Sequence, residues 1–208
     1  MPDLCLYFHA HQPIRLRDFS FPNITGGFGY EDESGNMAEF RDTLASCCIP
    51  LNRSVLKLLD KYKGGLRIGC SLSGIFLEML ESESAAGLER FRLLASSGMV
   101  DFMGEDYYRS FALTFSPEDF IAQVDLHRKK IKSLFDIRPE VFRNTESAFS
   151  NGLAKELESR GFRALINETP LEGAIPGKIY RPAGCVSLNF LQTGAPAGIP
   201  PKPGQLKK

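Results

Sequence analysis

Carboxylates that follow short apolar runs are the residues of this sequence best suited to chemistry, and Glu105 and Glu146 stand out among them. Two carboxylates that flank a glycosidic bond can cleave it, because one attacks the anomeric carbon or activates water and the other protonates the leaving oxygen. Arg143 lies three residues before Glu146, and a nearby guanidinium would favour the ionised form that a nucleophile needs. An ordinary surface ion pair is the competing interpretation of this spacing. Glu146 is the best candidate for a catalytic carboxylate.

Two histidines, His9 and His11, lie two residues apart on a predicted strand, so both side chains point to the same face. Such a pair is half of a metal site, but a metal needs further imidazoles or an aspartate at later strand ends. The third histidine, His127, falls in the middle of a predicted helix, where we interpret it as a residue at the boundary of the core. We therefore expect no metal and no cofactor.

Two tyrosines, Tyr107 and Tyr108, follow Glu105 directly. Aromatic rings offer large apolar faces, which suit the apolar faces of sugars. Further aromatic residues in a predicted loop could extend such a surface: Phe19, Phe21, Phe28 and Tyr30. The competing interpretation is that these rings belong to the core. We keep Tyr107 and Tyr108 as candidate substrate-binding residues.

The elements that must position these residues alternate between strand and helix. Apolar runs predict buried strands at residues 4–10, 66–74, 99–105, 141–145 and 163–167. Helical periodicity predicts helices at 54–65, 75–80, 87–95, 117–134 and 152–160. The predicted N-caps are Asn52, Ser116 and either Ser150 or Asn151. Residues 18–45 lack clean periodicity and are predicted to form a long loop.

This alternation predicts an α/β fold of parallel strands with helical crossovers, either a barrel or an open doubly wound sheet. Functional groups gather at the carboxyl ends of such strands. The residues near those ends are His9 and His11, then Cys70 and Ser71, then Glu105, Glu146 and Glu168. The sequence has no glycine-rich motif for binding nucleotides. Any one of these strand-end residues taken alone is most simply interpreted as a solvated loop residue. The presence of a polar residue at the end of every predicted strand favours a functional site.

The composition of the 208 residues is that of an ordinary soluble domain, with 43% apolar and 24% charged residues. Basic and acidic residues both number 25, so the formal net charge is zero. This balance does not indicate binding to nucleic acid or to an anionic membrane, which an excess of basic residues would favour. The N-terminus lacks the pattern of a signal peptide, and the five cysteines show no CxxC spacing. We expect reduced thiols and a cytoplasmic protein.

Several segments resemble glycoside hydrolase family 57, the family of alpha-amylases and 4-alpha-glucanotransferases. They are LYFHAHQPIRLRDF, VDFMGEDYYRSF, FSPEDFIAQVDLHRKKI and VFRNTESAFSNGLAKELESRGFRALINE, within a resemblance that runs from about residue 3 to about residue 190. The resemblance implies a (β/α)7-type barrel and a retaining mechanism on alpha-glucans such as starch, glycogen or maltooligosaccharides. It matches Glu146 to the nucleophile, and His11 and Glu105 to substrate-binding positions. Arg143, Tyr107 and Tyr108 complete the predicted site.

One part of the family pattern does not match. The general acid of the family is an aspartate in a fourth motif on a later strand, and no such motif is found here. Only about five β/α units are predicted, so we expect residues 1–193 to be the N-terminal portion of the barrel of a truncated chain. Residues 194–208 are predicted to be a disordered tail rich in glycine and proline. A homo-oligomer could pair the open strand edges of such a barrel.

Three interpretations stay open at this point. The leading one is an alpha-glucan hydrolase or transglycosylase, inactive if its acid is missing, and the residues do not decide between hydrolysis and transfer. The second is a non-catalytic glucan-binding remnant, which needs the aromatic residues and His11 but not Glu146. The third is a metal-dependent deacetylase or amidohydrolase on a related barrel, which the small number of histidines disfavours.

Overall fold

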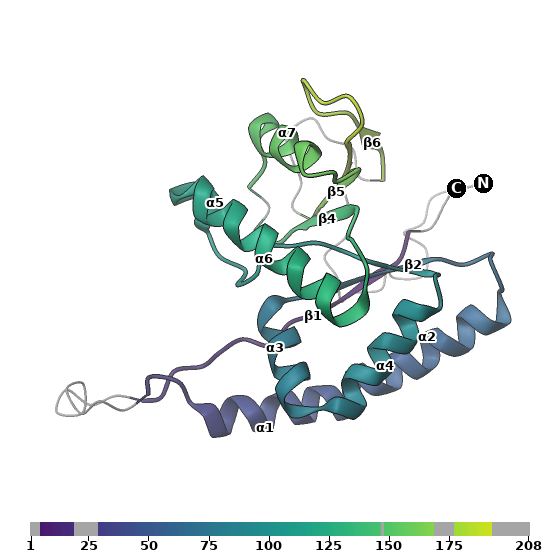
Figure 1. The fold of residues 1–208 in the computed structure, drawn as a ribbon, viewed down its shortest axis with the longest axis vertical. Helices are drawn as coiled ribbons and strands as arrows, with labels where there is room; N and C mark the ends of the chain where they lie inside the picture. Colours follow the sequence, from purple (N-terminus) through teal and green to yellow (C-terminus); the bar gives the residue numbers. More distant parts are fainter. Residues whose placement is uncertain (1–4, 19–28, 147, 169–176, 193–208) are drawn as a thin grey trace, which may run out of the picture. The chain divides into compact units, whose positions relative to one another are not determined.

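The computed structural model describes residues 5–18, 29–146, 148–168 and 177–192, and the chain divides into two compact units (Figure 1). The N-terminal unit comprises Met1–Phe102 and Lys129–Ile137. The C-terminal unit comprises Met103–Arg128 and Arg138–Lys208. Each unit has its own sheet and its own apolar core.

Three parallel strands form the sheet of the N-terminal unit: β1 (Tyr7–Ala10), β2 (Ile68–Leu72) and β3 (Val100–Phe102), in the order β1-β2-β3. Every residue of the central strand β2 is buried, as expected for a parallel strand whose two faces are both covered. The register places His9 opposite Ser71.

The helices of this unit follow each other closely. They are α1 (Glu33–Thr43), the π-helical segment η2 (Leu44–Cys48), α2 (Ile49–Lys61), α3 (Gly74–Glu83) and α4 (Ala85–Ser96). The core that they form with the sheet centres on Phe76, whose ring meets Phe40 and Phe91 edge-on at centroid distances of 5.6 and 5.9 Å. Edge-on contacts of this kind stabilise a core beyond the area that they bury.

Two predictions for the N-terminal unit were wrong. Residues 18–45 include helix α1, which lacks an apolar stripe because Asn36 and Phe40 are its buried residues, so its sequence shows no helical period. Its start is fixed locally, because Asp32 accepts a hydrogen bond from the N–H of Gly35 at 3.0 Å. Asn52 is not an N-cap: η2 runs directly into α2, so Asn52 lies inside a continuous helix and is buried.

Four strands form the sheet of the C-terminal unit: β4 (Val141–Asn144), β5 (Ala164–Asn167), β6 (Ile179–Tyr180) and β7 (Asn189–Gln192). Their order is β4-β5-β7-β6, with β4, β5 and β7 parallel and β6 antiparallel to β7. At the other edge of β4, the backbone of Gly104 forms a parallel bridge with Phe142. The polar ends of β4, of β5 and of the segment after β3 therefore come together.

The helices of this unit are α5 (Ala112–Phe115), the residues of α6 (Pro117–Phe135) up to Arg128, and α7 (Asn151–Ser159). Ser150 is the N-cap of α7, because its hydroxyl accepts a hydrogen bond from the N–H of Leu153 at 3.1 Å. Gly161 follows the helix at φ +87°, a conformation that suits glycine. The core of the unit includes Phe142, with Phe120 and Phe162 edge-on to it.

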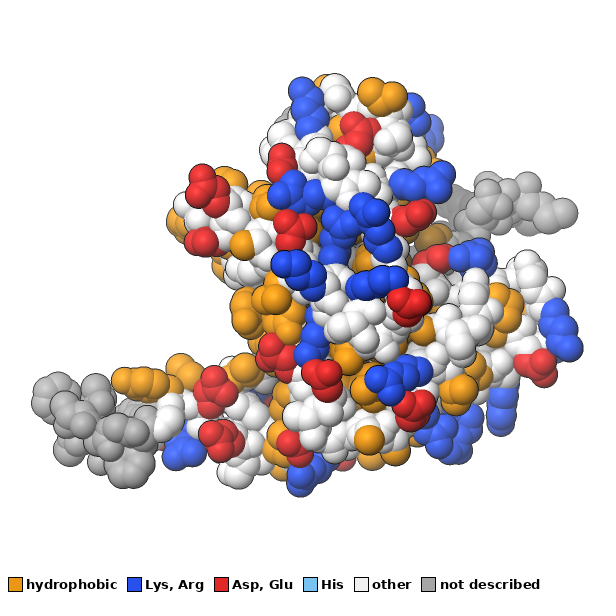
Figure 2. Space-filling view, in the orientation of Figure 1, with side chains coloured by type: hydrophobic (Ala, Val, Ile, Leu, Met, Phe, Trp, Pro, Cys, Tyr) orange, Lys and Arg blue, Asp and Glu red, His pale blue; other side chains and the backbone are white. Residues whose placement is uncertain are grey.

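The predicted alternation of strands and helices is confirmed, and helices with parallel strands are as expected for part of a (β/α)7-type barrel. Strands β6 and β7 come in addition to the five predicted strands. The predicted tail at 194–208 lies outside the described residues. In the described ranges no helix is long and apolar enough to cross a membrane. On the face shown in Figure 2, acidic and basic side chains are interspersed, in keeping with the zero formal charge.

Candidate functional site

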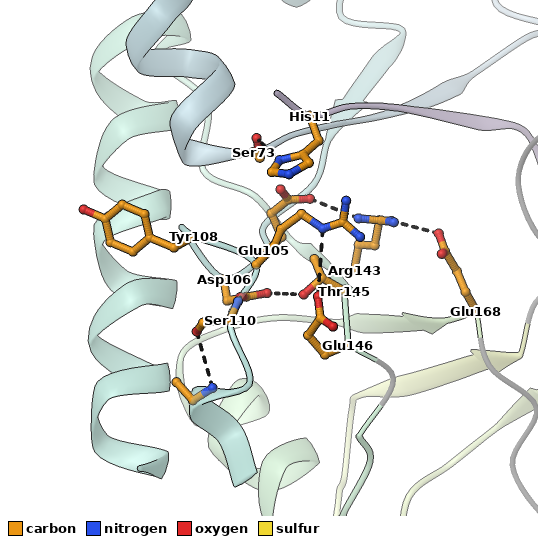
Figure 3. Close-up of polar contacts among 12 residues, drawn as sticks. His11, Ser73, Glu105, Asp106, Tyr108, Ser110, Arg143, Thr145, Glu146 and Glu168 are labelled. Atoms are coloured by element: carbon orange, nitrogen blue, oxygen red, sulfur yellow. Dashed lines mark hydrogen bonds and ion pairs between the residues drawn. The ribbon is translucent and has the colours of Figure 1, made fainter. Parts of the chain in front are cut away.

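A buried arginine joins two of the predicted carboxylates in the C-terminal unit (Figure 3). Arg143, on β4, lies 3.4 Å from Oε2 of Glu105 through Nη1 and 2.9 Å from Oε1 of Glu168 through Nε. The side chain of Glu105 is 0% exposed and that of Arg143 is 3% exposed, whereas that of Glu168 is 22% exposed. Burial of this kind needs paired charges, so the three side chains position one another.

Glu105 is held in place by the glycine before it. Gly104 donates its N–H to the carbonyl of Val141 and accepts the N–H of Arg143, both at 2.8 Å. A Cβ atom at position 104 would lie 2.8 Å from the ring of Phe162, closer than real Cβ contacts come. Glycine thus lets the backbone approach β4, and this approach brings Glu105 next to Arg143.

The candidate nucleophile Glu146 lies just beyond the carboxyl end of β4, with 23% of its side chain exposed. The guanidinium of Arg109 lies beside it, with Nε 4.0 Å from Oε1 of Glu146. The sequence pointed to Arg143 as the cation near Glu146, whereas the ion pair found for Glu146 is with Arg109. Arg109 has φ +54°, a value uncommon for a residue other than glycine.

Asp106 is a second buried carboxylate, one residue after Glu105. Its Oδ1 bonds to the hydroxyl of Thr145, and its Oδ2 accepts the N–H of Ser110 at 2.6 Å. Burial raises the pKa of Asp106, and the hydrogen bonds from Thr145 and Ser110 oppose this rise. Asp106 therefore connects the loop after β3 with the residue directly before Glu146.

The two predicted tyrosines differ in their surroundings. Tyr107 is buried, and its ring lies 4.8 Å from that of Tyr108 and 6.4 Å from that of His127. Tyr108 is 49% exposed, and in Figure 3 its ring points away from Glu105 and Glu146. His127, predicted at the boundary of the core, is fully buried, and its Nδ1 lies 3.5 Å from the backbone N–H of Glu105.

His11 belongs to the N-terminal unit, just after β1. Its Nδ1 lies 2.9 Å from the hydroxyl of Ser73, the N-cap of α3. The rings of His9 and His11 are stacked at a centroid distance of 6.1 Å, so the two side chains share a face as predicted. Within the described part of the chain, no three His, Cys, Asp or Glu side chains are grouped so as to hold a metal ion.

The sequence thus identified some residues of the C-terminal cluster and missed others. Arg143, Glu105 and Glu146 were singled out, and Glu168 was named as a strand-end residue. Arg109, Asp106 and Thr145 were missed because their contacts join loops that are distant in the sequence. The predicted loop aromatics Phe19, Phe21 and Phe28 lie outside the described residues, and Tyr30 is exposed.

Comparisons with known proteins identify the family. A model of glycosyl hydrolase family 57 matches residues 5–189. A curated protein of Methanocaldococcus jannaschii, named “Putative alpha-amylase”, is 33% identical over 163 residues, which are 77% of this chain and 34% of that protein. The chain thus spans about a third of the length of this relative.

Solved structures agree in fold. A 4-alpha-glucanotransferase from Thermococcus litoralis superposes with a TM-score of 0.63 at 17% identity, over 90% of this chain and 27% of that chain. A “putative polysaccharide deacetylase” from Mycobacterium smegmatis gives a TM-score of 0.60 at 14% identity, over 91% of this chain and 58% of that chain. At such identities the structural likeness concerns the fold alone. The match over residues 5–189, together with the 33% identical relative, shows that the chain belongs to glycosyl hydrolase family 57.

Proposed function

We propose that this chain carries the nucleophile half of an active site for alpha-glucans, with Glu146 as the nucleophile of a retaining mechanism. The observation that supports this most is Glu146 itself: a partly exposed carboxylate at the carboxyl end of β4, beside the guanidinium of Arg109, in a member of family 57. Functional groups of strand–helix folds lie at such strand ends. The substrate class is a maltooligosaccharide or a longer alpha-glucan.

In the first half-reaction, one oxygen of Glu146 attacks the anomeric carbon, and the bond from that carbon to the leaving oxygen breaks. The leaving oxygen takes up a proton, and the sugar stays attached to Glu146 as an ester. Water then releases the sugar in hydrolysis, whereas a sugar hydroxyl releases it in transfer. Nothing in the described residues favours one acceptor over the other, so both outcomes belong to the proposal.

No proton donor for the leaving oxygen is assigned. Glu105 is fully buried beside Arg143, which suits a carboxylate that holds its neighbours in position rather than one that meets a glucan. Without general-acid assistance the first step is slower by about 10²–10⁴-fold. A substrate whose leaving group needs no proton therefore gives the fairest test.

The proposed substrate-binding residues fall into two groups. Tyr108 and His11 have exposed or partly exposed side chains that a glucan could contact. Glu105, Tyr107 and Arg143 are buried in the chain as described, so we propose that they act by supporting the surface that a glucan meets. Cytoplasmic location and homo-oligomeric assembly remain predictions.

The test is to trap the sugar on the protein. The full chain is incubated with a 5-fluoro-α-glucosyl fluoride, from which fluoride departs without a proton, and is examined by intact-mass and peptide mass spectrometry. We expect one added glycosyl group on Glu146, and its loss in Glu146→Gln. Glu140→Gln, which alters an exposed ion pair with Arg163, is the matched control and should label like the wild type. Labelling elsewhere, or equal labelling of Glu146→Gln, would overturn the proposal.

A glucan-binding remnant is the second candidate, and the exposed ring of Tyr108 favours it, because binding requires an accessible aromatic face. Titration with maltoheptaose by calorimetry distinguishes the two candidates. Binding that Tyr108→Ala weakens and Glu146→Gln leaves intact, without any trapping of the fluoride, would support the remnant.

A further inference from the structure

One buried carboxylate, which the reaction itself does not use, joins the loop that carries Glu105 to the segment that follows β4 and carries Glu146. We propose that Asp106 is a positioning residue for Glu146, acting through Thr145 on one side and through the loop of Arg109 on the other. This inference rests on the proposed role of Glu146 as nucleophile. It adds residues that determine where that carboxylate stands.

The first contact of Asp106 fixes the backbone beside Glu146. The bridge between the two segments ends where Arg143 donates its N–H to Gly104. Beyond this bridge the segments are tied by side chains, and Asp106 Oδ1 bonds to the hydroxyl of Thr145. Thr145 precedes Glu146 directly, just past the end of β4, so this bond holds the backbone from which the Glu146 side chain departs.

The second contact of Asp106 fixes the cation that faces Glu146. Its Oδ2 accepts the N–H of Ser110 at 2.6 Å, which closes a turn around Arg109. The hydroxyl of Ser110 in turn lies 3.1 Å from Oε1 of Gln123 on α6, so the turn is anchored to a helix. The left-handed backbone of Arg109 is unfavourable by itself and needs such support.

The two oxygens of Asp106 thus serve two different segments, and both segments end at the same ion pair. One segment carries Arg109 and the other carries Glu146. Nε of Arg109 lies 4.0 Å from Oε1 of Glu146. A displacement of about 1 Å at a reacting group can cost about 10²-fold in rate. A side chain that sets both ends of this pair is therefore expected to influence the rate of attack more than the binding of sugar.

Conservative and disruptive variants form matched pairs at both positions. Thr145→Val removes the hydroxyl while keeping the shape, whereas Thr145→Ser keeps the hydroxyl. Asp106→Ala removes both contacts. Asp106→Asn can keep both, because its oxygen can accept from Ser110 while its amide group donates to the hydroxyl of Thr145.

The readout is the trapping rate of 5-fluoro-α-glucosyl fluoride as a function of its concentration, well below the melting temperature of each variant. We expect Thr145→Val and Asp106→Ala to lower the limiting rate by about 10–100-fold while the half-saturating concentration changes less than about threefold. Thr145→Ser and Asp106→Asn should stay within about threefold of the wild type. Equal limiting rates in Thr145→Val and Thr145→Ser would overturn the proposal.

A second measurement decides the matter even if the wild type traps no sugar, in which case the proposed function fails by itself. Carbodiimide coupling to glycine ethyl ester, followed by peptide mapping, measures how readily each carboxylate reacts. In Thr145→Val and Asp106→Ala, coupling at Glu146 should rise at least about threefold, because its pairing with Arg109 is loosened. Coupling at Glu140 serves as the internal control and should not change. Unchanged coupling at Glu146 in both variants would show that Asp106 does not position it.

Discussion

The two units of the chain bury different kinds of polar residues. The buried polar side chains of the N-terminal unit are neutral: Gln12, Asn36, Asn52, Ser71 and Ser73. The C-terminal unit buries four ionisable side chains, Glu105, Asp106, His127 and Arg143, beside the neutral Asn144, Thr145 and Asn167. The two units have similar apolar cores, each with fully buried phenylalanines meeting edge-on.

This difference indicates that the desolvation cost of buried charges falls on the C-terminal unit. A buried charge must be paired and hydrogen-bonded, because its desolvation is expensive. The C-terminal unit meets this requirement with Arg143 between Glu105 and Glu168, and with hydrogen bonds to Asp106 from Thr145 and Ser110. The N-terminal unit folds without such an arrangement among its described residues. The residues of the proposed nucleophile site, Glu146, Arg109 and Asp106, all belong to the C-terminal unit.

The largest expected effect comes from breaking the buried charge pair. Arg143→Met leaves Glu105 buried without its cation and should lower the free energy of unfolding by about 3–5 kcal/mol. Arg67→Met is the control in the N-terminal unit, where Arg67 and Asp101 form an exposed pair at 2.6 Å, and should cost at most about 1 kcal/mol. Urea unfolding followed by circular dichroism measures both. Similar costs for the two variants would remove the contrast between the units.

An intermediate effect is expected at the helix starts, where the units are alike. Ser84 caps α4 in the N-terminal unit and Ser150 caps α7 in the C-terminal unit, each by accepting a backbone N–H. Replacing either serine by alanine should cost about 1 kcal/mol in urea unfolding. A much larger cost at one of them would mean that the difference between the units extends beyond the buried charges.

The smallest effect concerns an exposed charge of the C-terminal unit. Hydrogen bonds to the Glu158 carboxylate, first of all from the backbone N–H of Ser187, lower its pKa from 4.5 to about 2. The folded state therefore favours the ionised form, so this stabilisation is complete above pH 4.5 and is lost as the pH falls through about 2. Glu158→Gln should lower the melting temperature by only about 1 °C at pH 7, because water screens the interactions of this exposed carboxylate.

The pH dependence of this variant provides its own check. The difference in melting temperature between Glu158→Gln and the wild type should shrink as the pH falls from 4.5 towards 2, because the wild-type carboxylate then becomes protonated. Glu156→Gln, on the same helix and ion-paired with Arg160, is the control for a charge loss without backbone partners. A difference that stays constant over this range would show that the charge of Glu158 contributes nothing.

Elements with strong local signals were predictable from the sequence. The serine caps of α6 and α7, and the glycines that follow α4 and α7, mark boundaries through single residues and their immediate neighbours. Helix α1 was missed because its buried residues, Asn36 and Phe40, do not form an apolar stripe. Asn52 misled the prediction, because asparagine is common at caps but lies here within a continuous helix.

Individual residues of the candidate site were predictable from the sequence, but the contacts between their side chains were not. Residue types at strand ends, with the family resemblance, pointed to Glu105, Arg143 and Glu146. The cation beside Glu146 is Arg109, which is 37 positions away, and no spacing rule links residues on different loops. The role of Asp106 was likewise invisible, because the bond to Thr145 forms only when two distant segments meet.

Gly104 has a consequence for any library of variants made from this chain. The room at this position is taken by the ring of Phe162, so even alanine would have to move that ring or the backbone. A saturation screen for the proposed glucan-modifying activity should therefore rank Gly104 among its least tolerant positions, as low in tolerance as Glu146. A search that identifies catalytic residues only by their intolerance to substitution would wrongly include Gly104, because this glycine is needed for its lack of a side chain.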